Sequence, residues 1–209
     1  MFKMASKIYL EGGGRIKDRV FEKLEKRILS LVSNKVIFEI DFARYGEKLK
    51  ERKIRDLNYF KELRAEEIFF SSDCDSKDIK KRINESGILY IAGGDTELLL
   101  DRIRKEGLVD LIKKFPGIII GNSAGAYACC REYVKIRDND VKVIPSLGLV
   151  DFCCMAHYER KFDNKLLEFS KDRDIYGIPE PSTIMIEDDK LSFIGDVYLF
   201  SKGEKIKIE

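Results

Sequence analysis

The chain has 209 residues, which is enough for one α/β domain with a buried core, and we expect a single domain over residues 1–209. Its 39 Lys and Arg nearly balance its 37 Asp and Glu, and the charges are scattered along the chain. This argues against a nucleic-acid-binding protein. No stretch approaches the ~20 apolar residues of a membrane span, and residues 1–10 lack the apolar core of a signal peptide. We therefore expect a cytoplasmic protein that binds neither nucleic acid nor a membrane.

The five cysteines are expected to be buried thiols. Four of them form the adjacent pairs Cys129-Cys130 and Cys153-Cys154 inside apolar runs. Such pairs do not suit a disulfide framework, and they are too closely spaced for a structural zinc site. We therefore expect a reducing compartment and neither a metal nor an organic cofactor.

Short apolar runs alternate with amphipathic segments in the first part of the chain, which is the pattern of βα units around a mostly parallel sheet. The predicted strands are residues 8–10, 36–42, 67–70, 88–92 and 117–120. The predicted helices are residues 16–31, 45–64, 76–85, 96–103 and 108–115. The helix at 45–64 is so polar that we expect it to be solvated. The strand at 117–120 has no polar alternation, which predicts a central strand buried on both faces.

From Leu147 onward the pattern becomes richer in strands. We expect strands at residues 150–156, 175–178, 183–187, 191–194 and 197–200, with one helix at 163–172. Their quick succession predicts a partly antiparallel arrangement. We find no linker or repeat, so the change is interpreted as one of topology within the domain.

The strongest local signal is Gly121-Asn122-Ser123-Ala124-Gly125, a G-x-S-x-G pattern between the buried strand and residues 126–134, which we expect to be helical. Small neighbours are needed because the serine backbone is forced into a sharp turn. Ser123 would lie at the carboxyl edge of the sheet, with the Ala124 N–H and the helix dipole beside a developing oxyanion. The alternative is a structural turn with a capping serine.

A serine nucleophile needs a base, and His157 is the only histidine of the chain. It follows the predicted strand at 150–156, near a carboxyl edge. Two acids fit the role of orienting it. Glu159 lies in an H-x-E arrangement that resembles class I glutamine amidotransferases, whereas Glu180 follows a later strand. The alternative for both acids is a solvated surface carboxylate.

Two glycine-rich turns follow predicted strands. Gly94, after Gly93, suits a second oxyanion-hole N–H because glycine lets the backbone approach a substrate oxygen, and an ordinary turn explains the pair equally well. The turn at residues 12–14 is not expected to bind a nucleotide, because Lys17 stands where G-x-G-x-x-G needs its last glycine.

Taken together, these segments resemble the peptidase E family (peptidase family S51), serine dipeptidases related to cyanophycinase. The matching segments are residues 92–96, 121–126, 147–149 with His157, and 177–180. The resemblance covers most of the chain from residue 88 onward and implies an α/β three-layer sandwich with a mostly parallel central sheet, of the class I glutamine amidotransferase-like type. It also implies Ser123 as nucleophile, His157 as general base and Glu180 as the orienting acid. Gly94 and Ala124 would supply the oxyanion hole.

The chain departs from the family's pattern at Ala92, Asp95, Asn122 and Pro181. A carboxylate at position 95, near the oxyanion site, would repel an acidic substrate or the oxyanion. Peptidase E cleaves dipeptides with an N-terminal aspartate, a preference that requires a cationic pocket. Arg131 and Arg137, which follow the serine motif, are the candidates for that pocket.

The sequence thus predicts a serine-type hydrolase, a peptidase that cleaves short peptides such as Asp-X dipeptides through an acyl-enzyme. An esterase or amidase on the same scaffold is one alternative. A catalytically silent binding protein is another, and Asp95 favours it. A glutamine amidotransferase subunit is disfavoured because Ser123 stands where its thiolate would have to be. The expected partner is a small peptide, and a homodimer stays open.

Overall fold

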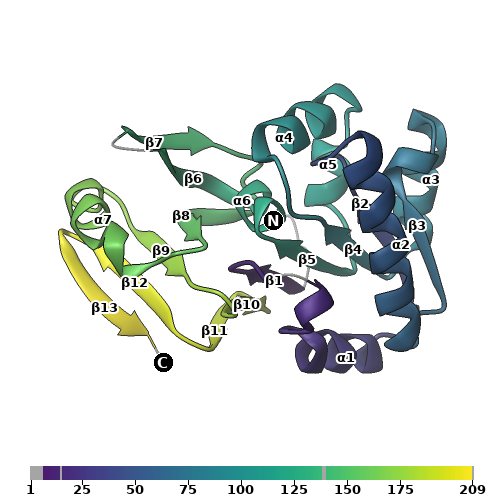
Figure 1. Ribbon diagram of the computed structural model, residues 1–209, viewed down its shortest axis with the longest axis horizontal. Helices are drawn as coiled ribbons and strands as arrows, with labels where there is room; N and C mark the ends of the chain where they lie inside the picture. The colour runs from purple at the N-terminus through teal and green to yellow at the C-terminus, as the bar shows by residue number, and fades with distance from the viewer. Residues whose placement is uncertain (1–6, 15, 138–139, 209) are drawn as a thin grey trace.

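A seven-stranded sheet forms the centre of the computed structural model, which describes residues 7–14, 16–137 and 140–208 (Figure 1). Five of its strands run parallel, in the order β1-β5-β4-β2-β3, and two antiparallel strands, β10 and β11, extend the sheet beyond β1. The strands are β1 (Lys7–Glu11), β2 (Val36–Ile40), β3 (Glu67–Phe70), β4 (Ile88–Ile91), β5 (Ile118–Asn122), β10 (Thr183–Glu187) and β11 (Lys190–Ile194). As predicted, β5 is buried along its whole length and lies at the middle of the sheet.

Helices cover both faces of this sheet and make three layers. Figure 1 shows α4 and α5 above strands β1, β5 and β4, with α1 below them. The helices are α1 (Glu22–Leu31), α2 (Gly46–Glu62), α3 (Ser76–Glu85), α4 (Thr96–Lys105), α5 (Val109–Lys113) and α6 (Ala124–Cys129). One apolar cluster joins the sheet to α1 and α2, and a larger one joins it to α3, α4, α5 and α6.

Aspartate side chains cap the starts of two of these helices. The Asp75 carboxylate accepts the N–H groups of Lys77 and Asp78, both at 2.8 Å, and so caps α3. Asp95 accepts the Leu98 N–H at 3.0 Å and caps α4. Each aspartate satisfies backbone donors that have no acceptor inside the helix.

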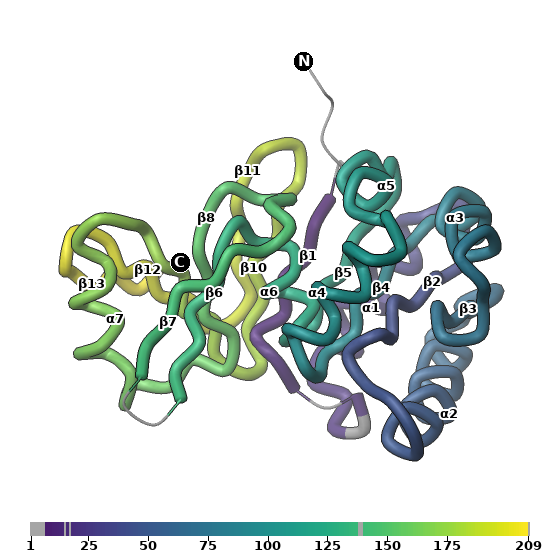
Figure 2. Tube along the Cα trace, turned by 90° about the horizontal axis from the view of Figure 1, so that it is seen from above, coloured from purple at the N-terminus to yellow at the C-terminus, as the bar shows by residue number. Residues whose placement is uncertain are grey.

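A second sheet lies beside the first, in the order β13-β12-β9-β8-β6-β7 (Figure 2). Its strands are β6 (Cys130–Arg137), β7 (Asp140–Pro145), β8 (Val150–Ala156), β9 (Ile175–Ile178), β12 (Val197–Ser201) and β13 (Glu204–Ile208), and α7 (Asp163–Phe169) packs against β12. β6, β8 and β9 are parallel, whereas β7, β12 and β13 run antiparallel to their neighbours. The antiparallel pairing predicted for the tail is therefore confirmed, although it is divided between two sheets.

Three predicted helices differ from the structure. The helix expected at 126–134 ends at Cys129, because the residues from Cys130 pair with β7 and β8 as strand β6. The helix expected at 16–31 is split into a 3₁₀ turn (Ile16–Asp18) and α1, with Arg19 at a φ of 53° between them. α2 is not a solvated helix, since one of its faces is buried.

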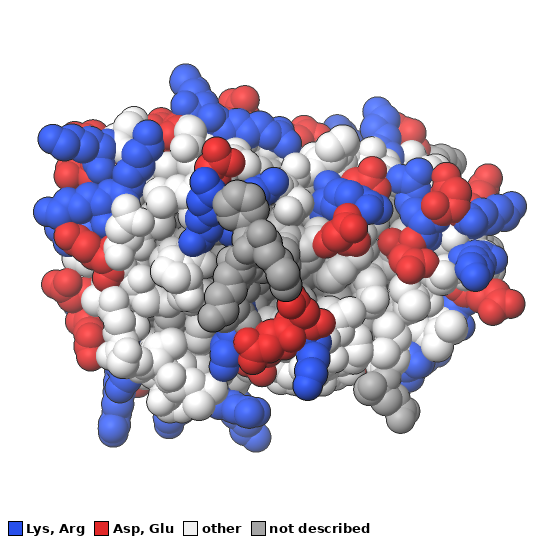
Figure 3. Space-filling model, turned by 180° about the vertical axis from the view of Figure 1, so that it is seen from behind, with Lys and Arg blue, Asp and Glu red and all other residues white. Residues whose placement is uncertain are grey.

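Strands β7 and β13 were not predicted. The expectation of a single domain over residues 1–209 stays a prediction, and residues 1–6 of the segment considered as a signal peptide lie outside the described residues. Among the described residues, no helix has the length and apolar character needed to cross a membrane. On the face seen in Figure 3, Lys and Arg side chains are interspersed with Asp and Glu.

Buried acids line the inner side of the α1 and α2 layer. Glu11, Glu25, Glu39 and Asp56 are each at most 1% exposed. Burial is the largest cause that raises the pKa of Glu25, to about 7, and the charge of Asp56 raises it further while the Tyr59 hydroxyl, which donates to Glu25, lowers it. Folding therefore favours the protonated form of this carboxyl.

We expect this burial to make the free energy of unfolding depend on pH. Between about pH 4.5 and pH 7 the unfolded chain releases the Glu25 proton and the folded chain keeps it, so the wild type loses stability as pH rises through that window. Glu25→Gln carries a neutral isostere and has no such loss. The difference in the free energy of unfolding between the two proteins should therefore change by about 3 kcal/mol across the window. Urea unfolding at a series of pH values measures it. A difference that is constant with pH contradicts the prediction.

Candidate active site

Ser123 occupies a sharp turn between β5 and α6. Its backbone has φ 54° and ψ −107°, a region that L-residues rarely adopt. As predicted, only glycine fits at the two flanking positions. A Cβ on Gly121 would lie 2.6 Å from the Gly125 carbonyl oxygen, and a Cβ on Gly125 would lie 1.9 Å from the Ile91 carbonyl oxygen. The turn thus places the Ser123 side chain at the carboxyl edge of the sheet.

A line of hydrogen bonds joins Ser123, His157 and Glu180. The Ser123 Oγ lies 2.6 Å from Nε2 of His157, and His157 Nδ1 is hydrogen-bonded to Glu180. Glu180 follows β9, whereas the other sequence candidate, Glu159, is ion-paired with Lys161 at 2.6 Å. The structure brings together the three residues that the resemblance implied, and it directs Glu159 elsewhere.

The end of β1 fixes both Ser123 and His157. The Ser123 N–H donates to the Glu11 carbonyl at 3.1 Å, and the His157 N–H donates to the Gly12 carbonyl at 2.6 Å. At the next residue, Gly13, a Cβ would lie 2.2 Å from the imidazole Cε1. The glycine-rich turn that the sequence indicated only as a connection is therefore part of the site.

Glu11 also supports the serine turn through its side chain. Its buried carboxyl accepts the Asn122 side-chain N–H at 2.8 Å. Burial, with a contribution from the charge of Glu25, raises the pKa of Glu11 well above its usual range. This carboxyl, on the neighbouring strand, thus holds the residue before Ser123 in place.

Both residues expected to form an oxyanion hole lie close to Ser123. Ala124 is the first residue of α6, so its N–H has no acceptor inside the helix. Gly94 follows β4 and lines the same cavity as Ser123. The nearby Asp95 carboxylate was expected to repel an oxyanion. In the structure it caps α4 and lines a neighbouring cavity.

Three arginines line the cavity of about 440 Å³ that contains Ser123, His157 and Glu180. They are Arg44, Arg52 and Arg55, from α2 and the loop before it. Neither of the arginines proposed from the sequence lines it, and that prediction was wrong: Arg131 is ion-paired with Asp151 at 2.7 Å and Arg137 ends β6.

For one of these arginines, Arg44, the sequence did contain a signal. Arg44 follows the predicted strand at 36–42, and the carboxyl ends of parallel strands meet at one edge of the sheet.

A second cavity, of about 400 Å³, shares Gly94 and His157 with the first. Its walls are more apolar and include Tyr127, Met155 and Phe162. The two cavities thus meet at the imidazole.

No metal centre was found in the part of the chain that the structure describes, since no three His, Cys, Asp or Glu side chains group suitably there. The two cysteine pairs are buried free thiols, as predicted. Burial raises the pKa of Cys129 and Cys153, which disfavours their thiolates.

We expect Gly13→Ala to break the His157 contacts, because the new methyl group and the imidazole cannot occupy the same space. The chain has one histidine, so the downfield proton resonance of the hydrogen bond between His157 Nδ1 and Glu180 is unambiguous in an NMR spectrum. It should disappear in Gly13→Ala. Gly107→Ala is the matched control, since Gly107 also has a positive φ and open space around it. Retention of the resonance in Gly13→Ala contradicts the prediction.

Comparisons with known proteins agree with this architecture. The model of peptidase family S51 matches residues 8–194. A peptidase from an acI-B1 actinobacterium has a TM-score of 0.74 at 17% identity, over 100% of this chain and 99% of that one. A candidate peptidase E protein of Listeria monocytogenes has a TM-score of 0.65 at 20% identity, over 92% of this chain and 98% of that one. These structures confirm the three-layer, class I glutamine amidotransferase-like fold.

Two curated relatives match a shorter segment. An uncharacterized peptidase of Listeria innocua is 26% identical over an alignment 128 residues long, which covers 54% of this chain and 61% of the relative. One from Listeria monocytogenes is 27% identical over an alignment 124 residues long, which covers 52% of this chain and 60% of the relative. The chain therefore spans about three fifths of the length of these relatives. The family model covers most of the chain, and on that ground the chain belongs to peptidase family S51.

Proposed function

We propose that the protein is a serine peptidase that cleaves short peptides with Ser123 as nucleophile, His157 as general base and Glu180 as the acid that orients the imidazole. The observation that carries the proposal is the unbroken line of hydrogen bonds through these three side chains beside a cavity. The same cavity adjoins the N-terminus of α6, where negative charge is stabilised. Family membership supports the same activity.

The reaction follows from this arrangement. The Ser123 Oγ bonds to the carbonyl carbon of the scissile peptide while its proton moves to His157 Nε2 and an electron pair moves onto the carbonyl oxygen. That oxyanion accepts hydrogen bonds from the backbone N–H groups of Gly94 and Ala124. When the C–N bond breaks, its electron pair stays on the amine nitrogen, which takes the proton from His157. Water then attacks the acyl-enzyme in the same way, and Ser123 recovers its proton as the acid product leaves.

The cavities favour a short substrate with an acidic residue. Arg44 and Arg55 both line the cavity beside Ser123. Each guanidinium has five N–H donors, and the Nε–H of Arg44 donates to Gly93 while that of Arg55 donates to Asp56. The N–H groups at the ends of both side chains can therefore bind a substrate. Such planar donors match the geometry of carboxylates and phosphates, and of these two groups an ordinary peptide carries the carboxylate. We therefore propose Asp-X dipeptides as substrates, with the aspartate among the arginines and residue X in the more apolar cavity beside His157.

The catalytic roles are tested by steady-state hydrolysis of a dipeptide panel. We expect Ser123→Ala and His157→Ala to lower kcat by about 10⁴-fold or more, and Glu180→Gln by at least about 100-fold, because the imidazole loses its orientation. Glu159→Gln, which changes the alternative acid, should keep a kcat at least about 10-fold higher than that of Glu180→Gln. If both glutamate variants are equally impaired, or the wild type cleaves nothing, the proposal fails. Cleavage of esters alone would favour an esterase.

Substrate preference is tested with the isosteric pair Asp-Leu and Asn-Leu. A charge-assisted hydrogen bond contributes about 1.5–3 kcal/mol, so the wild type should prefer Asp-Leu in kcat/KM by about 10-fold or more. Arg55→Gln should remove most of this preference. Arg131→Gln is the matched control, because Arg131 is paired with Asp151 outside the cavity, and it should keep the preference. An unchanged preference in Arg55→Gln contradicts the role of Arg55.

A further inference from the structure

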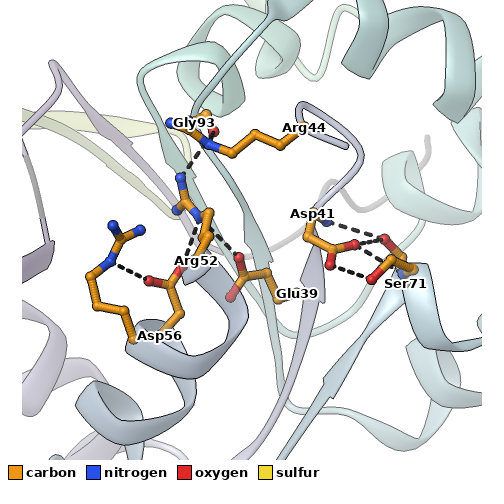
Figure 4. Close-up of polar contacts among 9 residues, drawn as sticks. Glu39, Asp41, Arg44, Arg52, Asp56, Ser71 and Gly93 are labelled. Carbon is orange, nitrogen blue, oxygen red and sulfur yellow. Dashed lines mark hydrogen bonds and ion pairs between the residues drawn. The ribbon is translucent and has the colours of Figure 1, made fainter. Parts of the chain in front are cut away.

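Two arginines converge on a single backbone carbonyl next to the candidate oxyanion hole. Figure 4 shows Arg52 and Arg44 directed at Gly93. The Arg52 Nη1 donates to the Gly93 oxygen at 2.9 Å, and the Arg44 Nε donates to it at 3.3 Å. The two cations approach the carbonyl from α2 and from the loop that precedes this helix.

The Gly93 carbonyl and the Gly94 N–H belong to the same peptide group. A peptide group is planar and trans, so its C=O and N–H point in opposite directions and turn together. Fixing the carbonyl toward Arg52 therefore fixes the N–H on the opposite side. The chain is held on the other flank as well, because the Asp95 N–H donates to the Ala43 carbonyl at 3.0 Å. A Cβ on Gly94 would lie 2.6 Å from that same oxygen.

Arg52 is built into the protein and is not a mobile surface group. Its side chain is 6% exposed, and its Nε donates to Asp56 at 2.6 Å and to Glu39 at 3.3 Å. Both acids are fully buried. Figure 4 shows them in contact with Arg52. A cation in such surroundings interacts more strongly with a neighbouring dipole than it would in water, because solvent screens it less.

We infer that Arg52 is a positioning residue for the oxyanion hole: it orients and polarises the Gly93–Gly94 peptide so that the Gly94 N–H becomes a stronger donor to the oxyanion. The inference rests on the proposed serine peptidase mechanism. Hydrogen bonds in a chain polarise one another, and a charge at the carbonyl end withdraws electron density from the N–H end. The effect is largest when the acceptor is negative, so it favours the tetrahedral intermediate over the bound peptide.

The alternative role for Arg52 is direct binding of the substrate, since it also lines the cavity. The two roles differ in kinetics. Loss of a substrate-binding group raises KM, whereas loss of an interaction that strengthens in the transition state lowers kcat. Arg55 offers the contrast, because it lies on the same helix and donates to the same Asp56. Among the described residues, the side chains that donate to the Gly93 carbonyl are those of Arg44 and Arg52, and Arg55 does not.

The test is a comparison of kcat and KM for Asp-Leu hydrolysis in the wild type, Arg52→Lys and Arg55→Lys. Lysine keeps the charge of Arg52 but lacks the fork that reaches both Asp56 and Gly93. We expect kcat of Arg52→Lys to fall about 10- to 100-fold, approaching the loss of one oxyanion-hole donor, with KM changed less than about 3-fold. Arg55→Lys should change mainly KM.

A second variant guards against a folding defect. Arg52→Met combined with Asp56→Met removes the closest buried pair together, a replacement that is often neutral for stability. Glu39, the other acid that contacts Arg52, is buried, and this burial raises its pKa well above its usual range, so it can remain there as a neutral carboxyl. The kcat of the double variant should fall as in Arg52→Lys. A folded variant of either kind that keeps kcat within about 2-fold of the wild type, or that changes KM alone, overturns the inference and leaves the proposed function intact. A wild type that cleaves no peptide overturns both.

Discussion

The site depends on the carboxyl end of β1, where two adjacent carbonyl groups hold the two reacting residues. The Glu11 carbonyl accepts the Ser123 N–H, and the Gly12 carbonyl accepts the His157 N–H. Ser123 follows a strand of the first sheet and His157 follows a strand of the second, so these bonds connect the two sheets at the point of chemistry. Both residues have a positive φ, 54° and 53°, which costs of order 1–2 kcal/mol each and persists only when the surroundings impose it.

Buried polar side chains support the same point. The Glu11 carboxyl accepts a hydrogen bond from the Asn122 side chain, and Arg52 of α2 donates to the Gly93 carbonyl. These groups are buried, so a broken contact would leave a polar atom without water to replace its partner. That penalty favours a single arrangement of these side chains over other conformations of similar energy. A single arrangement suits a site whose hydrogen-bond donors must be aligned before the substrate binds.

Local patterns in the sequence were sufficient for most of the sheet and for the serine. The run of isoleucines in β5 indicated a central strand, and the glycines around Ser123 indicated a turn that only small residues fit. The single histidine left one candidate base. The choice of Glu180 over Glu159 needed the family resemblance, because local sequence does not show which carboxylate a folded chain brings to an imidazole.

What the sequence did not show depends on long-range contacts. α2 was expected to be solvated because charged residues are usually exposed, but Arg52 and Asp56 are paired with each other and lie against Glu39 of β2. The segment after Cys129 was expected to be helical, and its pairing with β8, more than ten residues away, makes it a strand. The role of Gly13 appears only once His157 is folded against it.

The most direct measurement of the central claim is a crystal structure of the protein after reaction with a fluorophosphonate, a reagent that forms a tetrahedral adduct with an activated serine. The account predicts one phosphonyl group on Ser123, with an oxygen about 2.7–3.1 Å from the backbone nitrogens of both Gly94 and Ala124. His157 should remain hydrogen-bonded to Glu180. A folded protein that takes up no phosphonyl group, or an adduct whose oxygen points away from both nitrogens, would contradict the account.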